Sequence, residues 1–163
     1  MPFRDSTIDL SVKDNSNVIL IWGENEHGKT SLLNTIRWAF YGTATLKDLE
    51  KLTKEHIQSS NLNIDLVFFQ SNSEGEIVNS IQDAGKSLNG IIINAGGLSH
   101  TSISILDALL AIKIPKIEVH ISNLFTREEF RHSSYISKGV NGVVCGFGLN
   151  GYLLAIDGIN KLI

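Results

Sequence analysis

Short apolar runs alternate with amphipathic segments along most of the chain. A run that is apolar on both faces and roughly four to eight residues long is typical of a strand buried within a sheet. Runs of this kind predict strands at residues 17–23, 63–70, 90–94, 116–120 and 141–146.

The segments between these runs have apolar residues at three- and four-residue spacing, which predicts helices that pack on the sheet. They are residues 45–61, with Thr45 as the expected N-cap, 74–85, 101–112 and 149–163. Strands that alternate with helices predict an α/β fold with a doubly wound parallel sheet. Five strands fit a flavodoxin-like sheet in the order 2-1-3-4-5, which binds ligands at the carboxyl ends of its strands.

The composition fits one domain that spans residues 1–163. Hydrophobic residues make up 42% and charged residues 19%, as in ordinary globular proteins. The net charge of −3 favours no nucleic-acid partner, and no apolar run reaches membrane-spanning length. Cys145 is the single cysteine and can form neither a disulfide framework nor a zinc site, so we expect a reducing compartment, the cytoplasm.

An additional helical segment, residues 29–40, follows the first predicted strand. The stretch "GENEHGKT" before it fits the phosphate-loop pattern G-x-x-x-x-G-K-[ST] through Gly23, Gly28, Lys29 and Thr30. Backbone amides and the helix N-terminus would bind phosphate there, with charge from the lysine and a Mg²⁺ ligand from the threonine. The alternative is a helix that only packs on the sheet, through Leu32, Leu33, Ile36 and Phe40.

ATP hydrolysis needs an acidic residue at the end of a later strand, to hold Mg²⁺. The later predicted strands end in Asn94, His120 and Cys145, and none of these supplies it. The phosphate loop therefore predicts phosphate or nucleotide binding at most.

Polar residues concentrate where the later strands end. Asn94 ends one strand, and the glycines that follow it allow a ligand to approach the backbone closely. Glu118 and His120 alternate on the next strand, so they share a face, and the acid would hold the imidazole in one tautomer. Arg127 and Arg131 follow, and arginine near such a site indicates an anionic substrate. The alternative for all four charged residues is a solvated surface.

From residue 43 to the C-terminus the chain resembles a type II 3-dehydroquinate dehydratase. The resemblance rests on four stretches: "YGTATLKDLEKL", "FFQSNSEGEIVNSIQDA", "GIIINAGGLSHTSISILDALLAIKIPKIEVHISNLFTREEFRHSSYIS" and "GVVCGFGLNGYLLAI". It implies a flavodoxin-like enzyme that uses no metal and no cofactor, and a homo-oligomer built from trimers, as in the family's dodecamers. The implied reaction is the reversible anti-elimination of water from 3-dehydroquinate to 3-dehydroshikimate.

The resemblance also implies the role of each site residue. Tyr41 would be the base that takes the C2 proton, and His120, oriented by Glu118, would protonate the departing hydroxyl. Asn25 would hold the water that stabilises the enolate, and Asp107 would reach the site from a neighbouring subunit. The implied substrate-binding residues are Asn94, His100, Ile121 through its amide, Ser122 and Arg131.

A tyrosine base needs a nearby positive charge, because a free phenol has a pKa of about 10. In the family this charge comes from an arginine on a mobile lid before the tyrosine, a stretch resembling "LGxREPxxYG". Here "HGKTSLLNTIRWAFYG" takes its place. Arg37, four positions before Tyr41, is the best substitute, and Lys29 is a second candidate.

Residues 1–42 resemble instead the start of ABC-type ATPases of the DNA-repair and chromosome-maintenance kind, through "GENEHGKTSLLNTIRWAFYG". We therefore interpret the chain as an engineered chimera, with an ATPase-like segment at residues 1–42 and a dehydratase-like segment at residues 43–163. The main hypothesis is a type II dehydratase whose activity is reduced by the exchange of the lid. The alternatives are a phosphate- or nucleotide-binding protein without dehydratase or ATPase activity, and an inert scaffold.

Overall fold

The computed structural model describes residues 16–22 and 46–163. Their sheet has five parallel strands in the order β2-β1-β3-β4-β5, which confirms the predicted fold class and strand order. The strands are β1 (Ser16–Trp22), β2 (Ile64–Gln70), β3 (Gly90–Asn94), β4 (Lys116–His120) and β5 (Gly142–Cys145). The predicted phosphate loop, the helix at residues 29–40 and the Thr45 cap lie outside the described residues.

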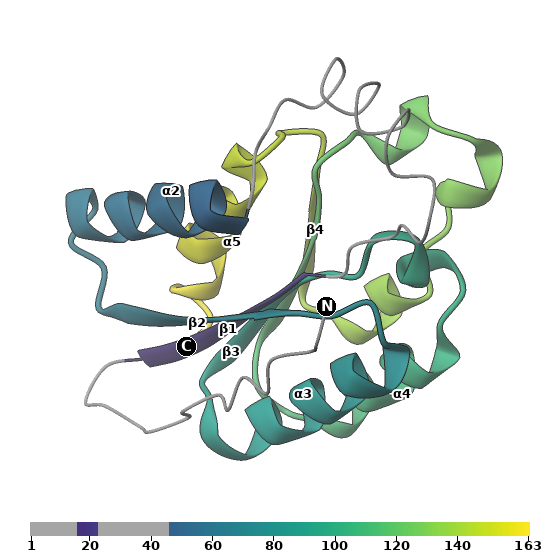
Figure 1. The fold of residues 1–163 in the computed structure, drawn as a ribbon, viewed down its shortest axis with the longest axis horizontal. Helices are drawn as coiled ribbons and strands as arrows, with labels where there is room; N and C mark the ends of the chain where they lie inside the picture. Colours follow the sequence, from purple (N-terminus) through teal and green to yellow (C-terminus); the bar gives the residue numbers. More distant parts are fainter. Residues whose placement is uncertain (1–15, 23–45) are drawn as a thin grey trace, which may run out of the picture.

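Four α-helices of the described part cover the sheet on both faces (Figure 1). They are α2 (Leu46–Ser59), α3 (Glu74–Ser87), α4 (Ile103–Ala111) and α5 (Asn150–Ile159). Each overlaps the helix predicted from its apolar spacing. Ser73 caps α3, and its side chain accepts a hydrogen bond from the Glu76 amide; Ser102 caps α4 by accepting one from the Ile105 amide.

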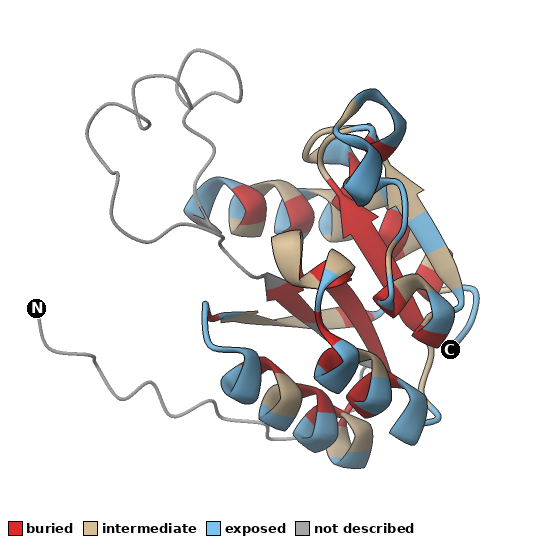
Figure 2. Ribbon diagram, turned by 90° about the vertical axis from the view of Figure 1, so that its right-hand side faces the viewer, coloured by how far each residue is buried: buried red, intermediate tan, exposed pale blue. Residues whose placement is uncertain are grey.

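The core lies in two layers, one on each face of the sheet. On one face α3 and α4 bury Ile77, Ile81, Ile105 and Leu109 against the central strands. On the other face α2 and α5 bury a second cluster, which includes Leu49, Tyr152, Ile156 and Ile159. Figure 2 shows the central strands as the buried centre of the molecule. A strand covered on both faces has little room for polar side chains, so the exceptions on β3 and β4 point to the site.

The carboxyl ends of β3 and β4 meet at one edge of the sheet. Ile93 pairs with Glu118 in the parallel register, and β4 continues to His120, so Asn94 and His120 end neighbouring strands. Short 3-10 turns follow these ends: η1 (Gly96–His100) after β3, then η2 (Leu124–Thr126), η3 (Glu129–Arg131) and η4 (Ile136–Gly139) between β4 and β5.

Candidate active site

A buried acid and a histidine occupy the end of β4. Glu118 is 0% exposed and His120 is 5% exposed. The Nε2 atom of His120 lies 2.6 Å from Oε1 of Glu118, so the two side chains share a face, as their alternation predicts. The alternative of a solvated surface pair is wrong for these two residues, because both are buried.

Two serines complete the surroundings of the Glu118 carboxylate. Ser134 donates a hydrogen bond to Oε1 at 2.8 Å, and Ser137 donates one to Oε2. Burial by itself would raise the pKa of Glu118. The hydrogen bonds from His120 and Ser137, the charge of His120 and the bond from Ser134 outweigh burial and lower that pKa below its usual value. Glu118 is therefore a carboxylate at neutral pH.

In each of the two site histidines, one ring nitrogen faces an oxygen atom that can only accept a hydrogen bond, so that nitrogen carries the proton. A carboxylate only accepts hydrogen bonds, so Nε2 of His120 carries a proton toward Glu118 and Nδ1 is left for other chemistry. The Nδ1 atom of His100 lies 2.8 Å from the carbonyl oxygen of Ser133 and donates to it, which leaves Nε2. The two rings stack with centroids 6.1 Å apart and an interplanar angle of 22°. The structure thus brings together His100, at the end of η1, and His120, at the end of β4.

The loop after β4 is tied to the turn after β3. Besides the His100 bond to Ser133, the Tyr135 amide donates to the Ser99 carbonyl at 2.8 Å. These bonds hold residues 133–135 over η1, and Ser134 lies between them with its hydroxyl on Glu118. The loop that supplies the serines is in this way fixed on the strand that carries the acid.

Asn94 ends β3 and is 6% exposed. Its Oδ1 accepts a hydrogen bond from the Gly96 amide at 3.2 Å, and its Nδ2 donates to the hydroxyl of Tyr152 at 2.8 Å. Gly96 has a φ of 58°, a left-handed conformation that a glycine adopts without strain. The glycines after Asn94 therefore serve a sharp turn that aims a backbone amide at the asparagine side chain.

The two arginines of the loop share the Glu128 carboxylate, since the Nε atom of Arg127 lies 3.4 Å and that of Arg131 lies 3.0 Å from Oε2 of Glu128. Arg127 donates to the Ser122 hydroxyl at 3.3 Å, so it lies against a predicted substrate-binding residue. The Nε atom of Arg131 donates to Glu128 at 3.0 Å, and its side chain is 26% exposed. Arg127 therefore lies near the carboxyl end of β4, two residues beyond which Ser122 stands.

Some predicted site residues lie elsewhere. Asp107 is exposed on α4, and its role at a neighbouring subunit stays a prediction. Seven others lie outside the described residues: Gly23, Asn25, Gly28, Lys29, Thr30, Arg37 and Tyr41. In the part of the chain that the structure describes, no group of three or more histidine, cysteine or acidic side chains could hold a metal ion. No helix among residues 46–163 is long and apolar enough to cross a membrane.

Three residues that sequence reasoning missed hold the site together: Ser134, Ser137 and Tyr152. None of them has a local pattern that indicates its role, because each partner is distant along the chain. The one available signal was indirect. A carboxylate on a strand with two covered faces needs several hydrogen-bond donors, and the serine-rich stretch after β4 is a nearby source.

The chain is similar to known proteins of one family. The family described as Dehydroquinase class II matches residues 16–160. The 3-dehydroquinate dehydratase of Prochlorococcus marinus (strain MIT 9301) is 50% identical over 144 residues, which cover 88% of this chain and 93% of that protein. The catabolic 3-dehydroquinase 1 of Fusarium vanettenii is 49% identical over 140 residues, which cover 86% and 93% of the two chains.

Solved structures give the same result. The type II dehydroquinase from Butyrivibrio crossotus DSM 2876 has a TM-score of 0.78 and 39% sequence identity, and the match covers 91% of this chain and 99% of that one. The type II dehydroquinase from Propionibacterium acnes has a TM-score of 0.76 at 34% identity, over 90% and 97% of the two chains. The chain therefore belongs to the class II dehydroquinase family.

Proposed function

We propose that this protein is a type II 3-dehydroquinate dehydratase, which eliminates water from 3-dehydroquinate to give 3-dehydroshikimate. The observation that carries the proposal is the fully buried Glu118 carboxylate bonded to His120 at the carboxyl edge of the sheet, in a chain of this family. A buried, oriented imidazole is a suitable general acid for a departing hydroxyl.

The elimination requires a base and an acid on opposite sides of the breaking bonds. The phenolate of Tyr41 takes the proton from the carbon beside the ketone, and the electron pair moves into an enolate. The enolate then expels the hydroxyl, which takes a proton from His120 and leaves as water. Glu118 keeps the imidazole ring oriented throughout, and Arg37 supplies the positive charge that favours the Tyr41 phenolate. Asn25 holds the water that hydrogen-bonds the enolate oxygen.

The substrate is bound by donors at the carboxyl edge of the sheet. Asn94 and His100 bind its hydroxyls, and Ser122 with the Ile121 amide binds its carboxylate together with Arg131. The Arg131 guanidinium is bonded to Glu128, so it exchanges that carboxylate for the one on the substrate. Arg127 supports the same group from behind, because it donates to the Ser122 hydroxyl.

A homo-oligomer accounts for the outer face of α4. Ile103 is 50% exposed and Leu110 is 58% exposed, and Asp107 lies between them on the same helix face at four- and three-residue spacing. An apolar face of this kind around a single acid suits a subunit contact in which Asp107 reaches the neighbouring active site. A trimer-based assembly, a dodecamer when complete, would then be required for full activity.

Absorbance of the conjugated enone product tests the function directly. Wild-type protein mixed with 3-dehydroquinate should develop this absorbance, and the Tyr41→Phe variant should lose at least about 10²-fold in kcat, because the base is removed. Absence of turnover by folded wild-type protein would overturn the proposal.

The alternative of a phosphate- or nucleotide-binding protein rests on the predicted phosphate loop, residues 23–30, alone. The family match begins at residue 16 and the P. marinus relative covers 88% of the chain, both of which favour the dehydratase. Titration of the wild type and of Lys29→Ala with ATP and Mg²⁺ separates the two. Nucleotide binding that Lys29→Ala abolishes, in protein without enone production, would support the alternative.

A further inference from the structure

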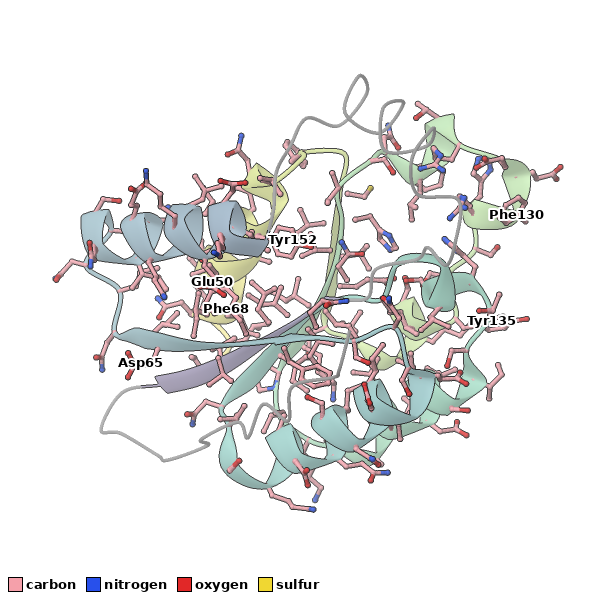
Figure 3. The ribbon with its side chains drawn as sticks, in the orientation of Figure 1. Glu50, Asp65, Phe68, Phe130, Tyr135 and Tyr152 are labelled. Carbon is pink, nitrogen blue, oxygen red and sulfur yellow. The ribbon has the colours of Figure 1, made fainter. Side chains whose placement is uncertain are left out.

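Tyr152 lies at the start of α5, and its side chain is 1% exposed. Figure 3 shows this side chain between α5 and the sheet. Its ring belongs to the core cluster that α2 and α5 form on that face, but its hydroxyl is the hydrogen-bond acceptor of the Asn94 Nδ2 atom at 2.8 Å. A residue with these contacts is both a packing residue and a partner of the proposed site.

The Asn94 amide has a limited number of hydrogen bonds to give. It has two N–H donors and one carbonyl oxygen that accepts twice. The Gly96 amide uses one acceptor position and Tyr152 uses one donor. One N–H and one acceptor position are thus left without a described partner, and these are the groups that a substrate hydroxyl can engage.

The torsion that turns an asparagine amide is soft, so the amide has no fixed direction of its own. The Gly96 amide is a donor, so it binds the oxygen end of the Asn94 side chain and would repel the nitrogen end. With this one hydrogen bond alone, the Asn94 side-chain amide could still rotate around the bonded oxygen. The bond to Tyr152 is the second point of attachment, and two points fix the plane of the amide.

We propose that Tyr152 is a positioning residue for catalysis, which holds the Asn94 amide so that its remaining N–H and carbonyl face the substrate. The inference rests on the proposed function, in which Asn94 binds a substrate hydroxyl. The proposed role of Tyr152 differs from that of Tyr41, because Tyr152 stays protonated. Burial raises the pKa of Tyr152 to about 12, and the hydrogen bond from Asn94 offsets only part of that rise. Tyr152 touches no reacting atom and acts only through Asn94.

A variant without the Tyr152 hydroxyl oxygen tests the positioning role of this residue apart from its packing role. Tyr152→Phe keeps the ring in the core and removes only the acceptor of the Asn94 bond. We expect kcat/KM for 3-dehydroquinate to fall about tenfold, which corresponds to the loss of one well-placed hydrogen bond. Tyr135→Phe is the matched control, because Tyr135 is 42% exposed and its ring faces Lys138 rather than Asn94. It should keep wild-type kcat/KM.

A double-mutant cycle tests whether Tyr152 acts through Asn94. Asn94→Ala should lower kcat/KM by more than tenfold, and adding Tyr152→Phe to it should cause no further loss, because there is no amide left to position. Unchanged activity in Asn94→Ala would overturn the substrate-binding role of Asn94, and the inference with it. If Asn94→Ala is impaired but Tyr152→Phe causes the same loss in both backgrounds, or no loss in either, Asn94 keeps its role and the Tyr152 inference fails.

Hydrogen exchange in the wild type gives a reading that does not depend on the variants. The two protons of the Asn94 side-chain NH2 should exchange at clearly different rates, because one is bonded to the buried Tyr152 hydroxyl. Equal, rapid exchange of both protons in the folded protein would contradict the inference.

Discussion

The neighbouring strands β3 and β4 carry polar groups of different charge near their carboxyl ends, and the protein surrounds these groups differently. On β4 the Glu118 carboxylate receives hydrogen bonds from His120, Ser134 and Ser137. On β3 the neutral Asn94 amide has two partners among the described residues, the Gly96 amide and the Tyr152 hydroxyl. Both groups lie in the same buried edge of one sheet, so charge is the main difference between them.

The number of partners follows from the free energy of burial. A carboxylate removed from water loses several kcal/mol of hydration, and donors on most of its lone pairs are needed to offset that loss. An amide loses much less and is satisfied by fewer bonds. The Glu118 carboxylate accordingly receives two serine hydroxyls from the loop at residues 133–137 in addition to His120. The neutral Asn94 amide is held by the turn after β3 and by one residue of α5.

Glu118→Gln removes the charge from the β4 group and should have the largest effect. Glutamine cannot accept the bonds of His120, Ser134 and Ser137 together, since one end of its side chain is a donor. The imidazole then loses the partner that fixes its tautomer, and we expect kcat to fall by about 10²–10⁴-fold with a smaller change in KM. Steady-state kinetics with 3-dehydroquinate measure both.

The control for that variant is Glu55→Gln on the outer face of α2. The Glu55 side chain is 61% exposed and lies 3.9 Å from Lys51, so its charge is well solvated. It should leave kcat unchanged. A Glu118→Gln enzyme that kept kcat within a factor of about three of the wild type would mean that the carboxylate is not what orients His120.

The sequence could predict the strands and the polar residues on them, but not the partners of those residues. Runs of apolar residues were enough for the strand order and for the α/β class, because a buried parallel sheet leaves a strong periodic signal. The alternation of side chains along β4 predicted that Glu118 and His120 share a face. The predicted end of β3 put Asn94 at the carboxyl edge of the sheet. These are local features, in which residues at fixed spacing on one element determine each other's position.

The partners of these residues could not be predicted in the same way. Ser134 and Ser137 lie 16 and 19 residues from Glu118, and Tyr152 lies 58 residues from Asn94. Their placement depends on how a loop and a helix close on the sheet, which spacing along the chain does not specify. Arg127 shows the same limit: an arginine near an anion site was expected, but its bond to Ser122 was not.

Tyr152, the partner on α5 of the neutral Asn94 amide, should make the stability of the protein sensitive to alkali. The pKa of Tyr152 is raised by burial to about 12, above the value of about 10 in the unfolded chain, so the stability linked to this proton is present below about pH 10. It is lost as the pH rises toward 12, by roughly 2–3 kcal/mol in the free energy of unfolding. Urea unfolding between pH 8 and about pH 11.5 should show this loss in the wild type and in Tyr135→Phe, and a smaller loss in Tyr152→Phe. Parallel curves for all three proteins would show that Tyr152 ionises as freely when folded as when unfolded.

The charged group on β4 should respond to acid instead. Because the pKa of Glu118 is lowered in the folded protein, its stability contribution is present above the unfolded value of about 4.3 and is lost as the pH falls through the folded value. Ser137→Ala removes one of the bonds that lower this pKa, so it should reduce the free energy of unfolding by about 1–2 kcal/mol at neutral pH.

The difference between Ser137→Ala and the wild type should then shrink as the pH falls through the lowered pKa of Glu118, because a protonated Glu118 no longer depends on that bond. Ser59→Ala is the matched control: its exposed hydroxyl donates only to the His56 carbonyl at 3.0 Å, and its removal should change stability by less than about 0.5 kcal/mol. Urea unfolding across pH 3 to about pH 7 measures all three proteins. A Ser137→Ala deficit that stayed constant over this range would mean that the serine supports packing alone, and that two donors are enough for a buried carboxylate.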